Sequence, residues 1–563
     1  MERGWPLRRR KGHPLSYYGP QVSISGASFR PYGRAYQFRR KLLLFFNKNP
    51  SLGVQARIRY LLSILLYFIC CYFCAKFTIL GLGEVASSKK VLPVFLLLTF
   101  LCSSRKTYLS LVLPLLIAIS IYAPVGIEFG PPNLQGAISL YATDFEEATA
   151  FLSLIGWLTY VKAVLIVLLS YVAYKISFVS NIKPWKNKVF VLIAIFVLVW
   201  IVKPTKFLSH LTKANEDMQE SLAQMEKYVN KSSWTDVTTN SRNTDYILVI
   251  GESARRDYFH VYGYPVSNTP FLDKVPATFV NGLSSGGVYT IGSLRLMLTH
   301  GKQNQWEPRY DFNLIDLTNA SGINTTWISN QGFVGRWDTP ISSIGVRAQK
   351  NIFPNSQGYE QSRLSDYRLL NFLSSELKRE KDKSHLYVLH TIGSHPNACS
   401  KLDDLEEPYK VSNSSLDYVA CYVSTIKKTD VFLSKLYEVM NENYKSSGRK
   451  FSIIYFSDHG QCHVEREGKI VINNNTVSKY HYDIPLIRID SDGVERRWLD
   501  SKKSGLLFTA GLAHWMGIET PQLPVYDLFD GVDDQEDFGL SEKIKQITTP
   551  DDPAIDISDS LIK

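Results

Sequence analysis

YILVIGESARRD, residues 246–257, passes from five consecutive apolar residues directly into a polar turn. A short apolar run without alternation predicts a strand buried on both faces, as in a parallel sheet. Three later runs have the same character: 325–329, 386–390 and 451–456. Amphipathic helices are expected over 365–381 and 418–441. Strands that alternate with helices predict a doubly wound, mostly parallel α/β sheet.

Polar residues able to bind a metal lie at the ends of three of these predicted strands. Glu252 follows the first strand, and Asp458 and His459 follow the last. His390 ends the strand at 386–390, and His395 comes shortly after it. In doubly wound sheets, functional groups gather beyond the carboxyl ends of the strands. An isolated Asp-His-Gly is more often part of a turn, but carboxylates and imidazoles together at equivalent places predict a zinc site.

The segment GGVYTIGS, residues 286–293, contains a candidate nucleophile, Thr290. We expect a helix over Ser293–Thr299, and the free N–H groups at a helix N-terminus favour a phosphate or an oxyanion. A zinc ion would lower the pKa of the Thr290 hydroxyl and make it nucleophilic near neutral pH. The alternative is that Thr290 or Ser293 serves only as the helix cap.

The N-terminal part of the chain is much more apolar than the rest. It contains five long apolar stretches: Tyr60–Leu82, Val91–Cys102, Tyr108–Val125, Phe151–Tyr174 and Val189–Val202. A bilayer core needs about 20 apolar residues, so the first, third and fourth stretches are predicted to span a membrane as they stand. The second and fifth are short and need flanking residues or little tilt to span. Buried core helices are the alternative for these two.

The distribution of charge indicates how these stretches are oriented. The net charge of the chain is +11, and the basic segment 1–59 can account for this excess. Because apolar stretches follow it directly, it indicates a membrane topology signal rather than a nucleic-acid surface. Basic loops at 105–106 and 175–188 alternate with an acidic loop at 128–147. By the positive-inside rule the N-terminus is cytoplasmic, and five crossings place the chain after Lys203 outside.

We therefore expect five parts. They are a basic cytoplasmic segment 1–59, a transmembrane domain of five helices at 60–203, a linker 204–243, an exported catalytic domain 244–540 and a loose acidic tail 541–563. The linker is polar and helix-prone, and it either lies along the membrane interface or spans the distance between the domains.

The cysteines are consistent with export of the second half. Cys399 and Cys421 flank a polar loop and can form a disulfide in an oxidising compartment, with two free thiols as the alternative. The others are Cys70, Cys71, Cys74 and Cys102, which lie in apolar stretches, and Cys462. In apolar surroundings cysteine behaves as a small hydrophobic residue.

The motif around Glu252 resembles that of a known family. Residues 250–257, with Gly263-Tyr264 and Asn268-Thr269-Pro270, look like the opening motif of the membrane phosphoethanolamine transferases of the alkaline phosphatase/sulfatase superfamily. The similarity continues through SNQG at 329–332, WDT at 337–339, LH at 389–390, GSHP at 393–396 and SDHG at 457–460. Within the family, the chain looks closest to the enzyme that modifies osmoregulated periplasmic glucans, and the lipooligosaccharide and lipid A transferases share these motifs.

The resemblance implies a fold, a location and a reaction. The exported domain would have the alkaline phosphatase/sulfatase-like fold and lie in the periplasm of a Gram-negative bacterium. The whole chain would be a multi-pass protein of the inner membrane, and we expect a monomer. The group transferred would be phosphoethanolamine, from phosphatidylethanolamine to a glycan or glycolipid acceptor. The implied metal ligands for a catalytic Zn²⁺ are Glu252, Thr290, Asp458 and His459. Thr290 would also carry the group, His395 would contact the phosphoryl group or a second zinc ion, and His390 would support the site.

One histidine of the family pattern is missing. In relatives a further histidine after the Asp-His-Gly motif approaches the phosphoryl group, but the corresponding stretch here reads VINNN at 471–475. His463 and His481 are candidate substitutes, with a surface position for either as the alternative. The departure leaves one zinc ion expected and a second one open.

Three other functions are weighed against this one. A sulfatase needs a Cys/Ser-x-Pro-x-Arg motif, but position 290 is threonine and no such pentapeptide occurs near it. A phosphoglycerol transferase or phosphodiesterase of the same superfamily would use the same threonine with a different lipid donor. An inactive scaffold predicts loss of the ligand set, which is complete here. The apolar stretches favour a lipid donor, because an enzyme that takes a lipid head group must meet it at the bilayer surface.

Overall fold

A computed structural model describes most of the chain after residue 49. The described residues are 50–84, 86–129, 152, 155–188, 190–192, 231–331, 340–354, 365–377, 383–396, 398–466, 468–473 and 477–562. Most of the basic segment 1–59, most of the fifth predicted span and most of the linker 204–243 lie outside the described residues. So do most of the acidic loop predicted to face outward and the WDT motif at 337–339.

Among the described residues, three apolar helices are long enough to cross a membrane. Helix α2 is Pro50–Gly81, α8 is Trp157–Ser180, and α4 (Arg105–Thr107), η1 (Tyr108–Val112) and α5 (Leu113–Phe129) follow one another without a break. The candidate spans within them are Gly53–Gly81, Arg105–Ile127 and Trp157–Ser180, of 29, 23 and 24 residues. Since about 20 residues cross a bilayer core, three of the five predicted spans are confirmed as helices of sufficient length.

The second predicted span forms a shorter helix. Helix α3 is Ser88–Leu101 and has 14 residues, including Pro93. At 1.5 Å per residue it is about 21 Å long, less than the roughly 30 Å of a hydrocarbon core. The prediction of five membrane-spanning helices is therefore supported for three helices of the described part, and α3 alone is too short to cross.

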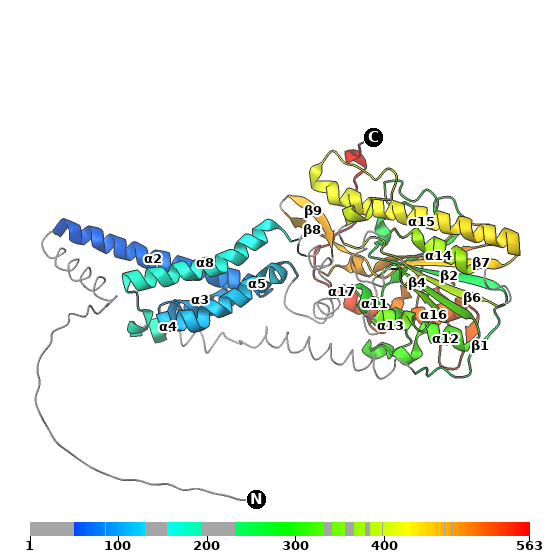
Figure 1. The fold of residues 1–563 in the computed structure, drawn as a ribbon, viewed down its shortest axis with the longest axis horizontal. Helices are drawn as coiled ribbons and strands as arrows, with labels where there is room; N and C mark the ends of the chain where they lie inside the picture. Colours follow the sequence, from blue (N-terminus) through cyan, green and yellow to red (C-terminus); the bar gives the residue numbers. More distant parts are fainter. Residues whose placement is uncertain are drawn as a thin grey trace, which may run out of the picture. The chain divides into compact units, whose positions relative to one another are not determined.

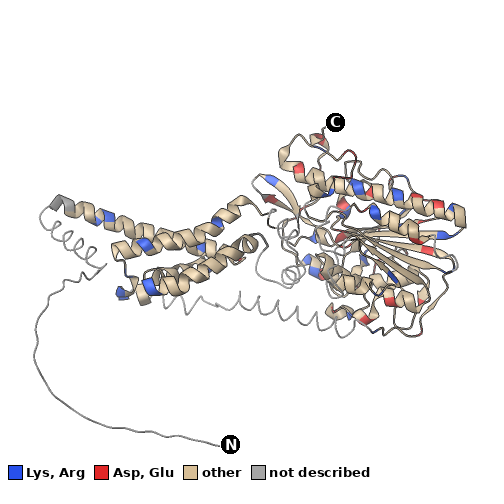
Figure 2. Ribbon diagram, viewed as in Figure 1, with Lys and Arg blue, Asp and Glu red and all other residues tan. Residues whose placement is uncertain are grey.

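Polar contacts join α8 to the helix that begins at Arg105. The rings of Tyr108 and Tyr174 stack with centroids 4.5 Å apart, and the Ser120 hydroxyl donates to the backbone oxygen of Ala163 at 2.7 Å. Charged side chains are sparse along these helices and mostly basic (Figure 2). Such composition suits helices that lie in a bilayer.

The second half of the chain is built on a nine-stranded sheet (Figure 1). Strands β7 (Lys450–Ser457), β2 (Thr244–Gly251), β6 (His385–His390), β4 (Asn324–Ser329) and β5 (Lys350–Ile352) are neighbours in this order and run parallel. Strand β10 (Asp483–Asp490) pairs antiparallel with β7 and with β3 (Thr278–Ser284), beside which lie the edge strands β11 (Arg497–Leu499) and β12 (Lys503–Ser504). Each of the four predicted strands lies within an observed one.

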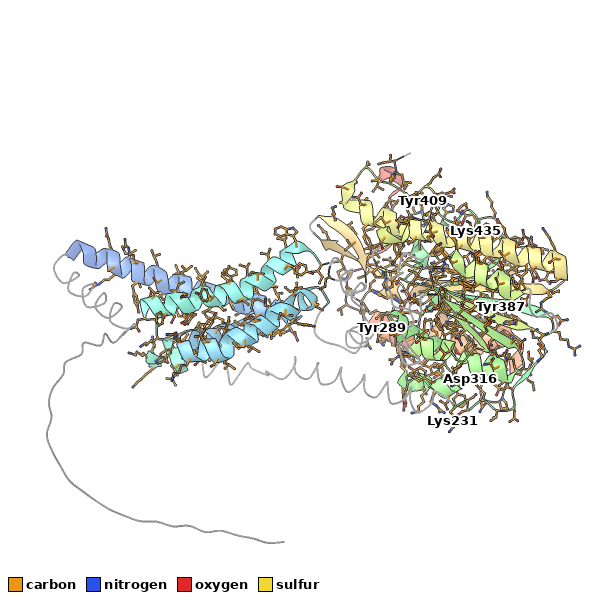
Figure 3. The ribbon with its side chains drawn as sticks, viewed as in Figure 1. Lys231, Tyr289, Asp316, Tyr387, Tyr409 and Lys435 are labelled. Atoms are coloured by element: carbon orange, nitrogen blue, oxygen red, sulfur yellow. A yellow bond between two sulfur atoms is a disulfide. The ribbon has the colours of Figure 1, made fainter. Side chains whose placement is uncertain are left out.

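Helices cover both faces of this sheet. Alternate residues of a strand point to opposite faces: Ile247 and Val249 pack in the core under α14 (Arg368–Leu377) and α15 (Asp417–Ser447). Leu248 and Ile250 pack in the core under α11 (Thr290–Met297), α12 (Leu314–Ala320), α13 (Pro340–Gly345) and α16 (Phe508–Trp515). Figure 3 shows Tyr409 and Lys435 on the α15 side and Tyr289 and Asp316 on the other. The predicted doubly wound α/β architecture is confirmed.

Helix boundaries differ from those expected at several points. α14 begins at Arg368 rather than at 365, and the described residues follow it to Leu377, whereas α15 continues past 441 to Ser447. It ends there because Gly448, at φ +72°, forms a left-handed cap. The other short elements are β1 (Thr238–Thr239) paired with β13 (Ile518–Glu519), and the hairpin of β8 (Cys462–Arg466) and β9 (Lys469–Asn473).

The C-terminal tail is packed, so the expectation that it is loose is wrong. After α17 (Leu540–Lys545) the chain returns to the α/β domain, where Ile557 is fully buried. The Tyr264 hydroxyl donates to the backbone oxygen of Ile555 at 2.7 Å, and Arg255 donates to that of Asp552 at 2.7 Å. Acidic composition suggested an exposed tail, but a few apolar side chains and an arginine within the domain hold it in place.

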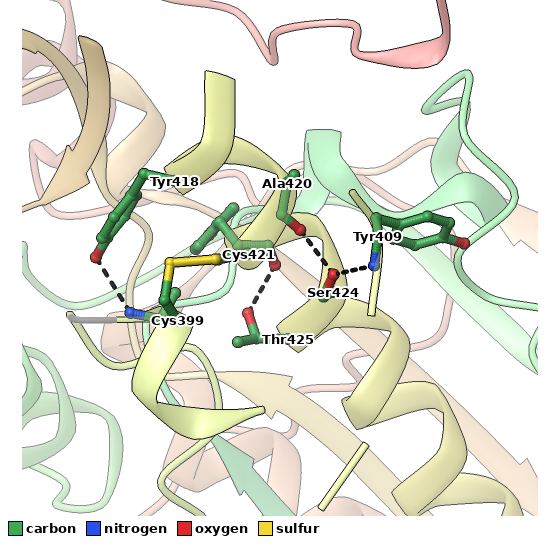
Figure 4. The surroundings of a disulfide bond; sticks show 9 residues. Cys399, Tyr409, Tyr418, Ala420, Cys421, Ser424 and Thr425 are labelled. Carbon is green, nitrogen blue, oxygen red and sulfur yellow. Dashed lines mark hydrogen bonds between the residues drawn. A yellow bond between two sulfur atoms is a disulfide. The ribbon is translucent and has the colours of Figure 1, made fainter. Parts of the chain in front are cut away.

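Cys399 and Cys421 form a disulfide, which confirms the expected pairing (Figure 4). Cys421 lies in the first turns of α15, and Cys399 lies in the short helix η8 (Ala398–Lys401). The bridge fastens the loop that follows His395 to the start of α15. The five remaining cysteines keep their thiols.

We expect thiol alkylation of the unfolded, unreduced protein to modify five of its seven cysteines. After reduction all seven should react, because the Cys399–Cys421 bond is then broken. Mass spectrometry of the alkylated chain gives both counts directly. Seven modified cysteines before reduction would eliminate the disulfide.

Candidate metal centre

The sheet register brings the predicted site residues to one edge. Ile250, near the end of β2, is opposite His390 on one side and Phe456 on the other. His390 is in turn opposite Ser329 at the end of β4. The polar residues that follow β2, β4, β6 and β7 therefore meet at the carboxyl edge of the sheet, where ligands bind in folds of this class.

Glu252 directly follows β2, and its side chain is buried, with only 1% of the residue exposed. Its Oε1 accepts a hydrogen bond from the Ser253 hydroxyl at 2.6 Å. Its Oε2 accepts from Thr290 Oγ1 at 3.1 Å and from Gln331 Nε2 at 3.3 Å. These donors fix the orientation of the carboxylate.

Asp458 and His459 leave the end of the neighbouring strand β7. Asp458 Oδ1 accepts from the backbone N–H groups of Ser253 at 2.8 Å and of His459 at 2.7 Å. Its buried Oδ2 accepts no hydrogen bond from the residues that the structure describes. His459 Nδ1 lies 2.6 Å from the backbone oxygen of Gly460. Because a carbonyl oxygen can only accept a hydrogen bond, Nδ1 carries the proton. Nε2 therefore keeps its lone pair, which can bind a metal ion.

Glu252, Asp458 and His459 form a cluster that fits a metal ion. One ligand atom from each lies within 4.8 Å of the others. His459 Nε2 is 3.6 Å from Glu252 Oε1 and 3.3 Å from Asp458 Oδ2. Burial, and then the charge of Asp458, hold the pKa of Glu252 well above its usual value. Two buried carboxylates and an imidazole lone pair facing each other need a proton or a cation between them, and the oxygen–nitrogen set suits zinc.

Thr290 adjoins this cluster as its fourth member. It is the first residue of α11, and its Oγ1 is 3.1 Å from Glu252 Oε2 and 3.4 Å from His459 Nε2. The predicted helix over 293–299 therefore begins three residues earlier than expected. Neither proposed cap is observed: Tyr289 is in the cap position, and the Ser293 hydroxyl donates to the backbone oxygen of Asp458 at 2.6 Å. Ser293 joins α11 to the Asp458 turn.

His390 and His395 lie beside the four residues without bonding to them. His390 Nδ1 is 3.3 Å from the Ser329 hydroxyl, and its buried Nε2 has no hydrogen-bond partner in the described part of the chain. His395 Nδ1 is 3.3 Å from the backbone oxygen of Pro396. Burial lowers the pKa of each imidazole to about 4, so both rings are neutral at pH 7.

The two candidate substitutes for the missing histidine have different surroundings. His463 Nε2 is 2.5 Å from the Tyr258 hydroxyl, and its Nδ1 is 3.7 Å from Asp552, away from the metal cluster. His481 is fully buried, its Nε2 has no hydrogen-bond partner among the described residues, and its backbone oxygen accepts from Gly460. Burial, and then the charge of His459, lower the pKa of His481 to about 3. Of the two, His481 is the one beside the site.

Two residues that contact the cluster, Ser253 and Gln331, were not predicted as site residues from the sequence. Ser253 donates to both carboxylates, once from its hydroxyl and once from its backbone N–H. Gln331 donates to Glu252 and to the backbone oxygen of Thr391 at 2.8 Å. Ser253 lies in the motif at 250–257 and Gln331 in SNQG at 329–332. Membership of these motifs was the signal in the sequence that could have indicated their roles. Their donor roles depend on strand register and on a left-handed turn, which residue type does not reveal.

Comparison with known proteins identifies the family. The Sulfatase family model matches residues 244–518. The chain is 36% identical over 416 residues to "Putative phosphoethanolamine transferase" of Haemophilus influenzae, covering 73% of this chain and 86% of that protein. The chain belongs to the phosphoethanolamine transferases. It is also 30% identical to "Phosphoethanolamine transferase OpgE" of Escherichia coli K12, covering 72% of this chain and 79% of the relative.

A solved structure supports the architecture. The integral membrane protein lipooligosaccharide phosphoethanolamine transferase A (EptA) from Neisseria meningitidis superposes with a TM-score of 0.55, at 17% identity, over 82% of this chain and 97% of the other. At this identity the likeness shows the fold. As a member of the family, the chain is an enzyme that transfers phosphoethanolamine. Its three long apolar helices indicate a membrane-anchored protein.

Proposed function

We propose that this enzyme transfers phosphoethanolamine from phosphatidylethanolamine to a periplasmic glycan in two steps, with Thr290 as the nucleophile. The observation that carries the proposal is the position of Thr290 Oγ1, 3.1 Å from Glu252 Oε2 and 3.4 Å from His459 Nε2. A hydroxyl becomes a nucleophile when an adjacent base accepts its proton or a bound metal ion lowers its pKa.

Glu252, Asp458, His459 and Thr290 would hold one zinc ion. When bound, the ion supplies a lower pKa for the Thr290 hydroxyl and positive charge against the phosphoryl oxygens. Support comes from Asp458 Oδ2, which has no hydrogen-bond partner among the described residues, from the lone pair that His459 Nε2 keeps, and from the burial of both carboxylates. A second ion stays open, because His390 and His395 have neutral rings that can serve either an ion or the phosphoryl group.

Both steps of the proposed reaction take place at Thr290. In the first step Thr290 Oγ1 forms a bond to phosphorus while the bond from phosphorus to the diacylglycerol oxygen breaks, and the proton lost by Thr290 ends on diacylglycerol. In the second step an acceptor hydroxyl takes the phosphoethanolamine group, and its proton restores the Thr290 hydroxyl. His395 would contact the phosphoryl group during both steps, and His390 would support the β6 end of the site. Positioning and charge stabilisation account for most of such catalysis.

The proposed lipid donor, phosphatidylethanolamine, implies where each part of the chain lies. A head group at the membrane surface is reached by a catalytic domain held next to the bilayer, so we place residues 244–540 in the periplasm and the helices of 60–203 in the inner membrane. Residues 204–243 would link them and residues 1–59 would be cytoplasmic. The packed tail at 541–563 belongs with the catalytic domain in this proposal, and we expect a monomer.

The test of this function examines the lipid donor with purified protein and the acceptor in a deletion strain. Purified protein incubated with phosphatidylethanolamine should release diacylglycerol, which thin-layer chromatography separates from the intact lipid. Phosphatidylglycerol in its place should give no diacylglycerol. Release from phosphatidylglycerol alone would instead identify a phosphoglycerol transferase. Mass spectrometry of lipopolysaccharide and periplasmic glucans from a deletion strain should show one acceptor, glycan or glycolipid, that lacks the mass of phosphoethanolamine.

His481 should matter to the reaction and His463 should not. We expect His481→Asn to lower kcat/KM by about 10- to 100-fold, because its buried Nε2 has no hydrogen-bond partner among the described residues and in this proposal bonds a phosphoryl oxygen. His463→Asn should stay within about threefold of wild type, because its contacts are with Tyr258 and Asp552. Steady-state kinetics of both variants decide between them. Equal activity losses would contradict this assignment.

A further inference from the structure

A strained residue connects the two carboxylates of the metal centre. Ser253 has φ +57°, a left-handed conformation that residues other than glycine rarely adopt. In this conformation its N–H donates to Asp458 Oδ1 at 2.8 Å and its hydroxyl donates to Glu252 Oε1 at 2.6 Å. A different backbone conformation would turn the N–H away from Asp458. Such strain persists where the surroundings hold the residue in place.

The hydroxyl of Tyr422 bridges the two sides of this strained turn. It donates to the backbone oxygen of Ser253 at 2.8 Å and accepts from the backbone N–H of Arg255 at 3.0 Å. Tyr422 is fully buried in α15, and its ring packs edge-on against Tyr258 with centroids 5.0 Å apart. One side-chain oxygen therefore satisfies the buried carbonyl of the left-handed residue and the buried N–H two residues after it.

The start of α15 is itself fastened to the site. The residue before Tyr422 is Cys421, which is bonded to Cys399 (Figure 4). One turn later, the Thr425 hydroxyl lies 2.8 Å from the hydroxyl of Ser394, the neighbour of His395. These contacts fasten the start of α15, and Tyr422 with it, to the loop after β6 that carries His395.

We propose that Tyr422 is a positioning residue for the metal centre, whose hydroxyl keeps Ser253 left-handed so that Glu252 and Asp458 converge. The inference rests on the proposed zinc site. Tyr422 touches neither substrate nor ligand atoms, and it acts through Ser253. Partners that orient metal ligands typically change metal affinity by 10- to 100-fold when removed.

The test measures zinc affinity of the full-length protein in detergent. Metal-free wild type and Tyr422→Phe are titrated with zinc against a competing fluorescent chelator, and the melting temperature of each metal-free protein is recorded. We expect Tyr422→Phe to raise the zinc Kd by about tenfold or more. Tyr409→Phe is the matched control, since its hydroxyl bonds the backbone oxygen of Ser267 at a more exposed place. The control should keep the wild-type Kd.

A second variant separates positioning from general stability. Glycine adopts a left-handed conformation without strain, so the Tyr422→Phe change should cost less than about threefold in a Ser253→Gly background. An equal loss in both backgrounds would overturn the inference. So would an unchanged Kd with a lower melting temperature, which is the signature of a structural tyrosine. A wild-type protein that binds no zinc would instead overturn the metal site, and this inference with it.

Discussion

Thr290→Ala should lose phosphoethanolamine transfer by a factor of about 10³ or more while the protein keeps its fold. The substitution removes the oxygen that forms the bond to phosphorus, and no other hydroxyl of the described residues contacts both Glu252 and His459. A thousandfold loss corresponds to about 4 kcal/mol of transition-state free energy. Release of diacylglycerol and labelling of the protein by a radioactive head group measure the two half-reactions separately.

Two further variants make this test specific. Thr290→Ser keeps a hydroxyl at the same place and should retain measurable transfer. Thr299→Ala removes a threonine hydroxyl just beyond the same helix, where it donates to the backbone oxygen of Arg295, and should keep wild-type activity. Wild-type transfer by Thr290→Ala would refute the nucleophile, whatever the other variants do.

Removal of the metal should abolish transfer and lower the melting temperature of the full-length protein by about 8–16 °C. Without a cation, Glu252 and Asp458 are two buried carboxylates in contact with the same Ser253. Binding to the folded state alone stabilises by roughly 4 kcal/mol at a thousandfold excess over Kd, and each kcal/mol is worth about 2–4 °C in a domain of this size. Differential scanning fluorimetry after dialysis against a chelator measures the shift.

Added zinc should restore both activity and melting temperature, whereas magnesium should not, because an imidazole and two carboxylates in a small cluster suit zinc. In Glu252→Gln the zinc-dependent shift should disappear, since the neutral amide is a poor ligand. Asp311→Asn alters a buried carboxylate that pairs with Arg309, and its zinc-dependent shift should persist. Full activity in a protein shown by elemental analysis to contain no metal would contradict the proposal.

The sequence was informative where a local pattern is sufficient to produce a structure. Uninterrupted apolar runs specify buried parallel strands, and those at 246–250, 325–329, 386–390 and 451–456 all lie within observed strands. Since parallel strands share one carboxyl edge, residue type and strand position together brought Glu252, Asp458 and His459 into one cluster. The Cys399–Cys421 pairing followed from two cysteines around one polar loop.

Other features depended on contacts between distant segments, which no local pattern encodes. The acidic tail is held by Arg255 and Tyr264, almost 300 positions away in the chain. The start of α11 was set at Thr290 because Ser293 bonds the Asp458 turn instead of capping the helix. Composition and periodicity thus determined the strands and the apolar helices, and residue type at the strand ends indicated the proposed ligands. Only tertiary packing decided which hydroxyls orient them, because a hydrogen bond between residues 253 and 422 exists only after the sheet and α15 have come together.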